Sequence, residues 1–234
     1  MRHQGSRALA IGGDPAEQGS LLRLLAASEI ELIRAPDGGG GLKVFYAERP
    51  DVIVLDLELE DADGLDVLAR IRELSDVPVV LVTAAVDGGD RVRGLRAGAD
   101  DCVSRPLDLA ELQARIEALL RRPRAEPSPE VIEDEFVHID HVRHRVEVLG
   151  VEVALTPTEF RMLATFAGNP GRVLGHGQLL EMVWGNGLRE RDEVKLYVSY
   201  LRRKLGEVAQ VDPVETVRGV GYRYQPHRVR QPIK

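Results

Sequence analysis

Asp51-Val52-Ile53-Val54-Leu55-Asp56 is the stretch of sequence that decides the fold of the first half of the chain. Its apolar run between two carboxylates predicts a strand that is buried on both faces and carries an acid to its carboxyl end. Similar runs predict further strands, and amphipathic patterns predict helices between them. The strands are expected over residues 7–11, 30–34, 51–56, 78–82 and 100–104, and the helices over about 15–27, 38–48, 64–74, 88–98 and 108–121. Alternating β-α units of this kind predict a doubly wound α/β domain with a parallel sheet.

Gly38-Gly39-Gly40-Gly41 falls at the start of the second predicted helix. Each glycine inside a helix destabilises it by up to roughly 1 kcal/mol relative to alanine. We therefore expect this helix to start late or to be mobile, with a plain loop as the alternative.

The carboxyl ends of two predicted strands carry different chemistry, because Asp56 ends one strand and Gly12-Gly13 ends another. In a doubly wound domain the ligand site lies beyond these strand ends, so a carboxylate there could accept a phosphoryl group. Aspartyl-phosphate chemistry needs a divalent cation with oxygen ligands, which two glycines do not supply. We therefore expect no metal centre and no cofactor, although weak magnesium binding by Asp56, Asp14 and the carbonyl of Glu58 stays open.

The composition and motifs predict a soluble cytoplasmic protein that is not an enzyme. The 234 residues suggest two domains, and a single cysteine, Cys102, fits a reducing compartment without an intrachain disulfide. The sequence starts almost directly with a strand, so no signal peptide is expected, and no apolar run approaches the ~20 residues of a membrane span. The sequence has no Walker motif, no HExxH and no Ser/His/Asp order that would indicate an enzyme.

The second half of the chain has a different pattern. Residues 123–130 contain three prolines and predict a linker. Short antiparallel strands are expected over 131–155, helices over about 157–168, 176–184 and 191–205, and a hairpin over 214–225 that turns at Gly219-Val220-Gly221. Residues 1–122 hold 15 Lys+Arg and 22 Asp+Glu, whereas residues 189–234 hold 11 and 6. The basic excess near the end of the chain predicts a nucleic-acid surface there.

The chain resembles a two-domain response regulator of the OmpR/PhoB type over nearly its whole length. In the first half the resemblance rests on Asp56-Leu57-Glu58-Leu59, Asp63-Gly64-Leu65, Val82-Thr83-Ala84, Ala97-Gly98-Ala99-Asp100-Asp101 and Arg105-Pro106-Leu107. In the second half it rests on Leu155-Thr156-Pro157-Thr158-Glu159-Phe160, Leu201-Arg202-Arg203-Lys204-Leu205 and Thr216-Val217-Arg218-Gly219-Val220-Gly221-Tyr222-Arg223. The resemblance implies a flavodoxin-like (βα)5 receiver over residues 1–122, a linker over 123–130 and a winged helix-turn-helix domain over 131–230. It also implies a dimeric transcription regulator that binds double-stranded promoter DNA and contacts RNA polymerase.

Three departures from the family concern the receiver site. The family has an acidic pair where Gly12-Gly13 stands, lysine where Arg105 stands and usually an aromatic residue where Cys102 stands. Asp56 matches the family's phosphoacceptor, and Thr83 matches its switch hydroxyl.

Three interpretations of the receiver follow. In the leading one the receiver works without phosphorylation, and Arg105 and Thr83 compensate the charge of Asp56. The second is conventional phosphorylation of Asp56 by a histidine kinase. The third is a small-molecule sensor that uses the vacated pocket. Asp14 precedes Pro15 and is expected to cap the first helix.

The helix over 191–205 is expected to read DNA in the major groove. Val194, Val198, Leu201 and Leu205 form a stripe that faces a core. By resemblance the DNA-binding residues are Trp184, Arg191, Lys195, Ser199, Tyr200, Arg202, Arg203 and Arg218. Arg218 is expected to enter the minor groove from the wing, and Arg191 and Arg203 to bind phosphates. For Trp184, core packing is the equal alternative.

The resemblance places dimerisation on the receiver face formed by the helix over 88–98, the strand over 100–104 and the helix over 108–121. The expected ion pairs join Arg91 to Glu111, and Asp100 or Asp101 to Arg115. Two such chains would read direct or inverted half-sites about one helical turn apart.

Overall fold

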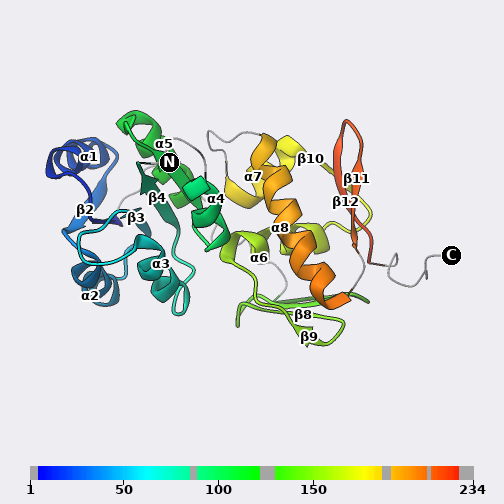
Figure 1. Cartoon of the computed structure of the whole chain (residues 1–234). Helices are drawn as coiled ribbons and strands as arrows, with labels where there is room; N and C mark the ends of the chain where they lie inside the picture. Colours follow the sequence, from blue (N-terminus) through cyan, green and yellow to red (C-terminus); the bar gives the residue numbers. More distant parts are fainter. Residues whose placement is uncertain (1–4, 85–88, 122–129, 186–190, 210–211, 227–234) are drawn as a thin grey trace. The chain divides into compact units, whose positions relative to one another are not determined.

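The computed structural model of the protein describes residues 5–84, 89–121, 130–185, 191–209 and 212–226 (Figure 1). The predicted linker lies almost entirely outside these residues. Contacts divide the chain into two compact units, Met1–Arg121 and Arg122–Lys234, and each is described by itself.

In the described part of the first unit a parallel five-stranded sheet has the order β2-β1-β3-β4-β5. The strands are β1 (Ser6–Ile11), β2 (Ile30–Ala35), β3 (Val52–Asp56), β4 (Val79–Thr83) and β5 (Asp101–Ser104). Because β2 and β3 lie on opposite sides of β1, the strand order reverses between β1 and β3. A reversal of this kind opens a ligand crevice at the carboxyl ends of the strands, where Gly12 and Asp56 lie.

Helices cover both faces of this sheet. They are α1 (Pro15–Ala27), α2 (Gly38–Glu48), α3 (Gly64–Arg72), α4 (Gly89–Arg96) and α5 (Leu109–Leu120). Helix α1 packs against α5, and α2 packs against α3. The face under α1 and α5 is closed by apolar side chains that include Leu25, Val54, Val80, Leu112 and Ile116. The predicted doubly wound receiver fold is confirmed.

The expectation that the glycine-rich second helix starts late was wrong, since α2 begins at Gly38. Two carboxylates cap it: Asp61 accepts hydrogen bonds from the backbone N–H groups of Gly38 (2.8 Å) and Gly39 (3.0 Å), and Asp37 accepts one from Gly40 (2.6 Å). A Cβ atom on Gly41 would lie 2.6 Å from the side chain of Ile11, so glycine lets the helix approach β1 closely.

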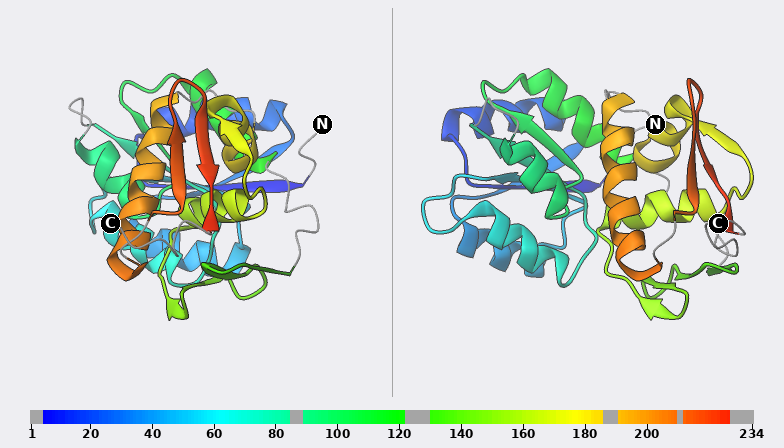
Figure 2. Two further views of the ribbon diagram at one scale, coloured as in Figure 1. Left: turned by 90° about the vertical axis from the view of Figure 1, so that its right-hand side faces the viewer. Right: turned by 45° about the vertical axis from the view of Figure 1, so that its right-hand side comes forward.

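The second unit begins with an antiparallel sheet of β6 (Val131–Glu133), β7 (Val137–Asp140), β8 (Arg145–Val148) and β9 (Val151–Glu152). Helices α6 (Pro157–Ala167), α7 (His176–Trp184) and α8 (Arg191–Ala209) follow and pack against one another. Strand β10 (Val173–Gly175) pairs with the hairpin of β11 (Val214–Val217) and β12 (Gly221–Tyr224), whose strands lie side by side in both views (Figure 2). The winged-helix prediction is confirmed, although β10 was not predicted and α8 ends four residues later than expected.

The motif around Thr156 builds the start of α6 as a capping box. The Thr156 hydroxyl accepts from the backbone N–H of Glu159, and the Glu159 carboxylate accepts from the backbone N–H of Thr156 at 2.8 Å. Lys204 of α8 donates to the same buried carboxylate at 2.6 Å. This contact joins two of the motifs that carry the resemblance and fixes α8 against α6.

Candidate functional site

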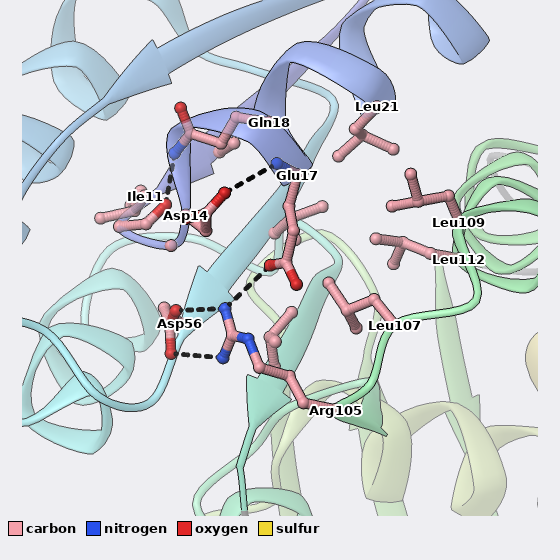
Figure 3. Close-up of a pocket in the computed structure, with 15 residues that line it drawn as sticks. Ile11, Asp14, Glu17, Gln18, Leu21, Asp56, Arg105, Leu107, Leu109 and Leu112 are labelled. Atoms are coloured by element: carbon pink, nitrogen blue, oxygen red, sulfur yellow. Dashed lines mark hydrogen bonds and ion pairs between the residues drawn. The ribbon is translucent and has the colours of Figure 1, made fainter.

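Asp56 ends β3 as a buried carboxylate with both oxygens occupied. The Nη2 group of Arg105 donates to Oδ2 at 2.8 Å, and its Nη1 group donates to Oδ1 at 3.4 Å (Figure 3). The backbone N–H of Glu58 donates to Oδ1 at 3.0 Å. The structure therefore brings together Asp56 and Arg105, which lie 49 residues apart in the sequence.

Glu17, in the first turn of α1, completes this site and was missed by sequence reasoning. Its Oε2 atom lies 3.2 Å from Nη2 of Arg105, so one guanidinium joins two carboxylates (Figure 3). The hydrogen bond to Asp56, assisted by the charge of Glu17, raises the pKa of Arg105 above its ordinary value. The acidic first turn behind the Asp14-Pro15 helix start was the signal that could have indicated Glu17.

Gly12 and Gly13 have positive φ angles of 72° and 89°. A Cβ atom on Gly12 would lie 2.3 Å from Cδ2 of Leu59, so the leucine fills the space that a side chain at position 12 would need. A Cβ atom on Gly13 would lie 3.5 Å from Oδ2 of Asp56 and 3.6 Å from Nη2 of Arg105. Leu59 was also missed by sequence reasoning, because nothing in its local pattern points to the strand end.

These residues do not fit a divalent cation of the kind that the family resemblance implies. Asp56 and Glu17 are paired with Arg105, and Asp14 accepts from the N–H groups of Ala16 (2.7 Å) and Glu17 (3.1 Å) as the expected helix cap. Across the described ranges, no three His, Cys, Asp or Glu side chains are grouped to hold a metal ion. Magnesium requires oxygen ligands in near-ideal octahedral geometry. The Arg105 guanidinium contacts both oxygens of Asp56, which such an ion would need as a ligand.

A cavity of about 30 Å³ lies beside the ion cluster. Its apolar side is formed by Leu21, Leu107, Leu109 and Leu112 (Figure 3). This volume suits about one water molecule, whereas ligand pockets usually have roughly 300–1,000 Å³. The cavity in this conformation therefore has no room for a metabolite.

Thr83 and Cys102, the two other family positions of the receiver site, are both buried. Thr83 ends β4, and its carbonyl accepts from the backbone N–H of Arg105 at 2.9 Å. Burial, together with the charge of Asp101, raises the pKa of the Cys102 thiol to about 12. A small inert thiol thus stands where the family usually has an aromatic ring.

Two of the acids expected at the dimer interface are satisfied inside the chain. Asp100 is fully buried. Its Oδ2 atom accepts hydrogen bonds from Nη2 of Arg72 at 2.8 Å and from the backbone N–H of Val79 at 3.0 Å. The expectation that Asp100 reaches a partner chain was therefore wrong, because its carboxylate fixes α3 to the edge of the sheet.

Arg115 pairs within its own chain with both Asp101 (2.9 Å) and Glu111 (2.6 Å). Asp101 is 2% exposed, and its second oxygen accepts from the backbone N–H of Cys102 at 2.8 Å. Arg91, Glu111 and Arg115 are half-buried on α4 and α5. Of the expected interface residues, these three remain accessible to a partner.

The exposed face of α8 is narrower than expected. Lys195, Ser199 and Arg203 are exposed along it, and Lys195 pairs with Asp192 at 2.7 Å. Arg218 is exposed in the turn between β11 and β12. The side chain of Arg191 lies outside the described part of the chain.

Tyr200 and Arg202, which were expected to bind DNA, have structural positions instead, and Trp184 takes the core position that was its equal alternative. Tyr200 is 3% exposed and Trp184 1% exposed, because both rings pack with Tyr197 in the helical core. Arg202 binds the carbonyl of Val214 and the hydroxyl of Thr216, pairs with Asp212 at 2.8 Å and lies over the ring of Tyr222. Arg202 therefore fastens α8 to the hairpin. The predicted core stripe of Val194, Val198, Leu201 and Leu205 is buried as expected.

Comparisons with known proteins agree with this architecture. The family model "Response regulator receiver domain" matches residues 9–117, and "Transcriptional regulatory protein, C terminal" matches residues 150–224. The transcriptional regulatory protein PrrA of Mycobacterium tuberculosis is 41% identical over 220 residues, covering 92% of this chain and 94% of PrrA.

Solved structures show the same two-part likeness. A mutant of RitR has a TM-score of 0.77 at 27% identity, with 94% of this chain and 99% of that chain covered. DrrB of Thermotoga maritima, an OmpR/PhoB homolog, shares the fold with a TM-score of 0.52 at 24% identity, covering 96% of this chain and all (100%) of DrrB. None of the helices in the described ranges is long and apolar enough to span a membrane.

Proposed function

The chain belongs to the OmpR/PhoB family of response regulators, which bind DNA and regulate transcription, and we propose that its receiver acts without phosphorylation and pairs two chains on promoter DNA. The observation that carries the proposal is the two-pronged contact of Arg105 with Asp56. Both carboxylate oxygens are engaged, so neither is free to attack a phosphoryl donor. The family lysine at this position is a compact point charge, whereas arginine is a planar fork suited to carboxylates.

The DNA-binding part of the proposal rests on one exposed helix face and one exposed turn. Lys195, Ser199 and Arg203 of α8 are spaced by four residues and point away from the core. A helix of this kind fits the major groove, and Arg218 at the hairpin turn is suited to the adjacent minor groove. RNA polymerase, reached through the same domain in the cytoplasm, is the partner we propose at the promoter.

The dimer part of the proposal rests on the receiver face formed by α4, β5 and α5. Arg115 is fixed by Asp101 and Glu111 in the same chain, so this face presents an ordered charge pattern in the absence of any phosphoryl group. Dimerisation through it would be constitutive. A cognate histidine kinase and a cofactor are then not needed.

Phosphorylation independence is tested by incubating the full chain with acetyl phosphate and magnesium and measuring intact mass and affinity for promoter DNA. We expect no phosphoryl adduct and no change in affinity, with Asp56→Asn as the control. An adduct on the wild type alone, with a gain in affinity, would establish the conventional phosphorylated regulator instead.

The wing assignment predicts that Arg218→Ala weakens specific DNA binding by roughly 1–3 kcal/mol. The loss of binding free energy should persist at several salt concentrations. A minor-groove arginine contributes contacts within the groove in addition to the release of a counterion. Arg143→Ala is the matched control, since Arg143 is an exposed arginine in the turn between β7 and β8. Equal affinities of the two variants would refute the wing assignment.

A further inference from the structure

Three separate segments of the receiver meet at one positive charge. Glu17 comes from α1, Asp56 from the end of β3, and Arg105 from the residue that follows β5 (Figure 3). The guanidinium lies 2.8 Å from Asp56 and 3.2 Å from Glu17. Its side chain is 25% exposed and that of Asp56 is 6% exposed, so solvent screens the contact only in part.

Leu59 occupies the rest of the space at the strand end. It lies against the backbone of Gly12, and a Cβ atom on Gly38 would also meet it, at 3.1 Å. The loop that carries Leu59 is anchored by Asp61 to the start of α2 and by a bridge between Glu58 and Asp63. An ion entering beside Asp56 would have to displace the guanidinium, with Leu59 closing the Gly12 side of the site.

Electrostatics explains why a cation must lie here. Two carboxylates face the same point, and a buried carboxylate without a positive partner is costly. Arginine remains charged at every pH at which the protein is folded, and its fork reaches both acids at once. Removing it would leave Asp56 and Glu17 around an uncompensated space lined by oxygen atoms.

We infer that Arg105 is a resident cation that takes the place of a divalent metal ion, excludes that ion, and joins α1, β3 and the start of the α5 segment. The inference rests on the proposed phosphorylation independence and supplies its physical basis. A divalent cation binds this site only after Arg105 is removed, and it then restores the stability that the substitution takes away.

The test uses the full chain and measures the unfolding of the receiver alone. Cys102, the single cysteine, is buried in β5, so its alkylation in increasing urea reports receiver unfolding. The urea midpoint is compared in millimolar MgCl2 and in NaCl of equal ionic strength. The variants are Arg105→Gln, Arg105→Gln with Asp56→Asn, and Arg93→Gln, an exposed arginine of α4 that serves as the control.

We expect the wild-type and Arg93→Gln midpoints to be the same in both salts. The midpoint of Arg105→Gln should fall by about 1 M urea in NaCl, and MgCl2 should recover at least half of the loss. The double variant should not respond to MgCl2, because one of the two acids is gone. The inference fails if the wild type responds like Arg105→Gln, if Arg105→Gln is as stable as the wild type, or if MgCl2 restores nothing.

Arg105→Lys is the second variant, to be used if Arg105→Gln does not fold. Its ammonium keeps the charge but loses the fork, so we expect a lower midpoint than the wild type. We expect no response to MgCl2, because the acidic pair that accompanies lysine in the family is replaced here by Gly12 and Gly13. A clear MgCl2 response of the lysine variant would refute exclusion by charge. Because no arm measures DNA binding or phosphoryl transfer, failure here is distinguishable from failure of the proposed function.

Discussion

Asp56 and Arg105 show how one substitution changes the chemistry of a strand end. A lysine at position 105 would place a single charge near the acid, whereas the arginine fork binds both oxygens of Asp56 and reaches Glu17 as well. In the proposed phosphorylation-independent receiver, the carboxylate is therefore part of the structure and does not act as a nucleophile. Gly13 lies beside this pair, since a Cβ atom there would contact both the acid and the guanidinium, whereas a Cβ atom at Gly12 would meet Leu59.

The Cys102 thiol is predicted to be unreactive in the folded protein. Burial raises its pKa from 9.0 to about 12, and the thiolate is the reactive form. At about pH 8 the thiolate fraction falls roughly 1,000-fold relative to an exposed cysteine. Alkylation by iodoacetamide should therefore be at least that much slower in the native chain than in denaturing urea, with Cys102→Ser as the blank. A native rate within tenfold of the unfolded rate would place the thiol at the surface.

Sequence reasoning reached only part of the site at the scale of single residues. The pairing of Asp56 with Arg105 was predictable, because a buried acid without a metal needs a cation and Arg105 follows β5, whose carboxyl end lies at the same edge of the parallel sheet. Glu17 and Leu59 were not predictable, since their roles depend on the angle of α1 and on the path of the loop after β3. Asp100 was wrongly predicted to face a partner chain and Tyr200 to face DNA. The sequence shows that such a residue is polar or amphipathic, but not which neighbour in the fold it contacts.

At the scale of elements, the four adjacent glycines at the start of α2 differ in how much space a side chain would have. The Cβ of Gly41→Ala would meet Ile11 at 2.6 Å, so this variant should lower the free energy of unfolding by about 1–3 kcal/mol. Gly39→Ala is the matched control, because its Cβ has ordinary contacts of 3.5 Å or more and alanine favours a helix by about 0.5–1 kcal/mol. Urea unfolding should therefore shift in opposite directions for the two variants. A shift in the same direction would show that packing against β1 does not require glycine at position 41.

Helix α8 illustrates why a helix face is harder to predict than the helix itself. The apolar stripe of Val194 and Val198 was clear from the sequence, and it predicts one buried side. The helix packs against α6 and α7, and Arg202 also fastens it to the hairpin, so the covered sector extends to Tyr200 and Arg202. Tertiary contacts over this wide a sector cannot be predicted from a single apolar stripe, and the exposed side of the helix is correspondingly narrow.

At the scale of the whole molecule, charge is distributed unevenly along the chain. The first 122 residues have a net charge of −7 and residues 189–234 a net charge of +5, so the end of the chain is the part whose charge favours a polyanion. The fold class could be predicted from the sequence, because the apolar runs of the strands and the amphipathic patterns of the helices alternate regularly along the chain. The proposed pairing of receivers could not be predicted in the same way, because a single chain supplies only half of the contacts of such an interface.

Dimerisation through α4, β5 and α5 predicts that only one of two arginines on the same helix affects the dimer Kd. Arg91 is half-buried on the proposed interface, whereas Arg93 is 60% exposed and pairs with Asp90 at 2.9 Å. A two-fold interface uses each contact twice, so Arg91→Glu should raise the dimer Kd at least about tenfold by repulsion from Glu111. Arg93→Glu carries the same charge change and should leave it unaltered. Sedimentation velocity at low and high salt measures both variants without any phosphoryl donor. A monomeric wild type, or equal Kd values for the two variants, would remove this face as the interface, and then the fixed charges around Arg115 would serve only the fold of the receiver.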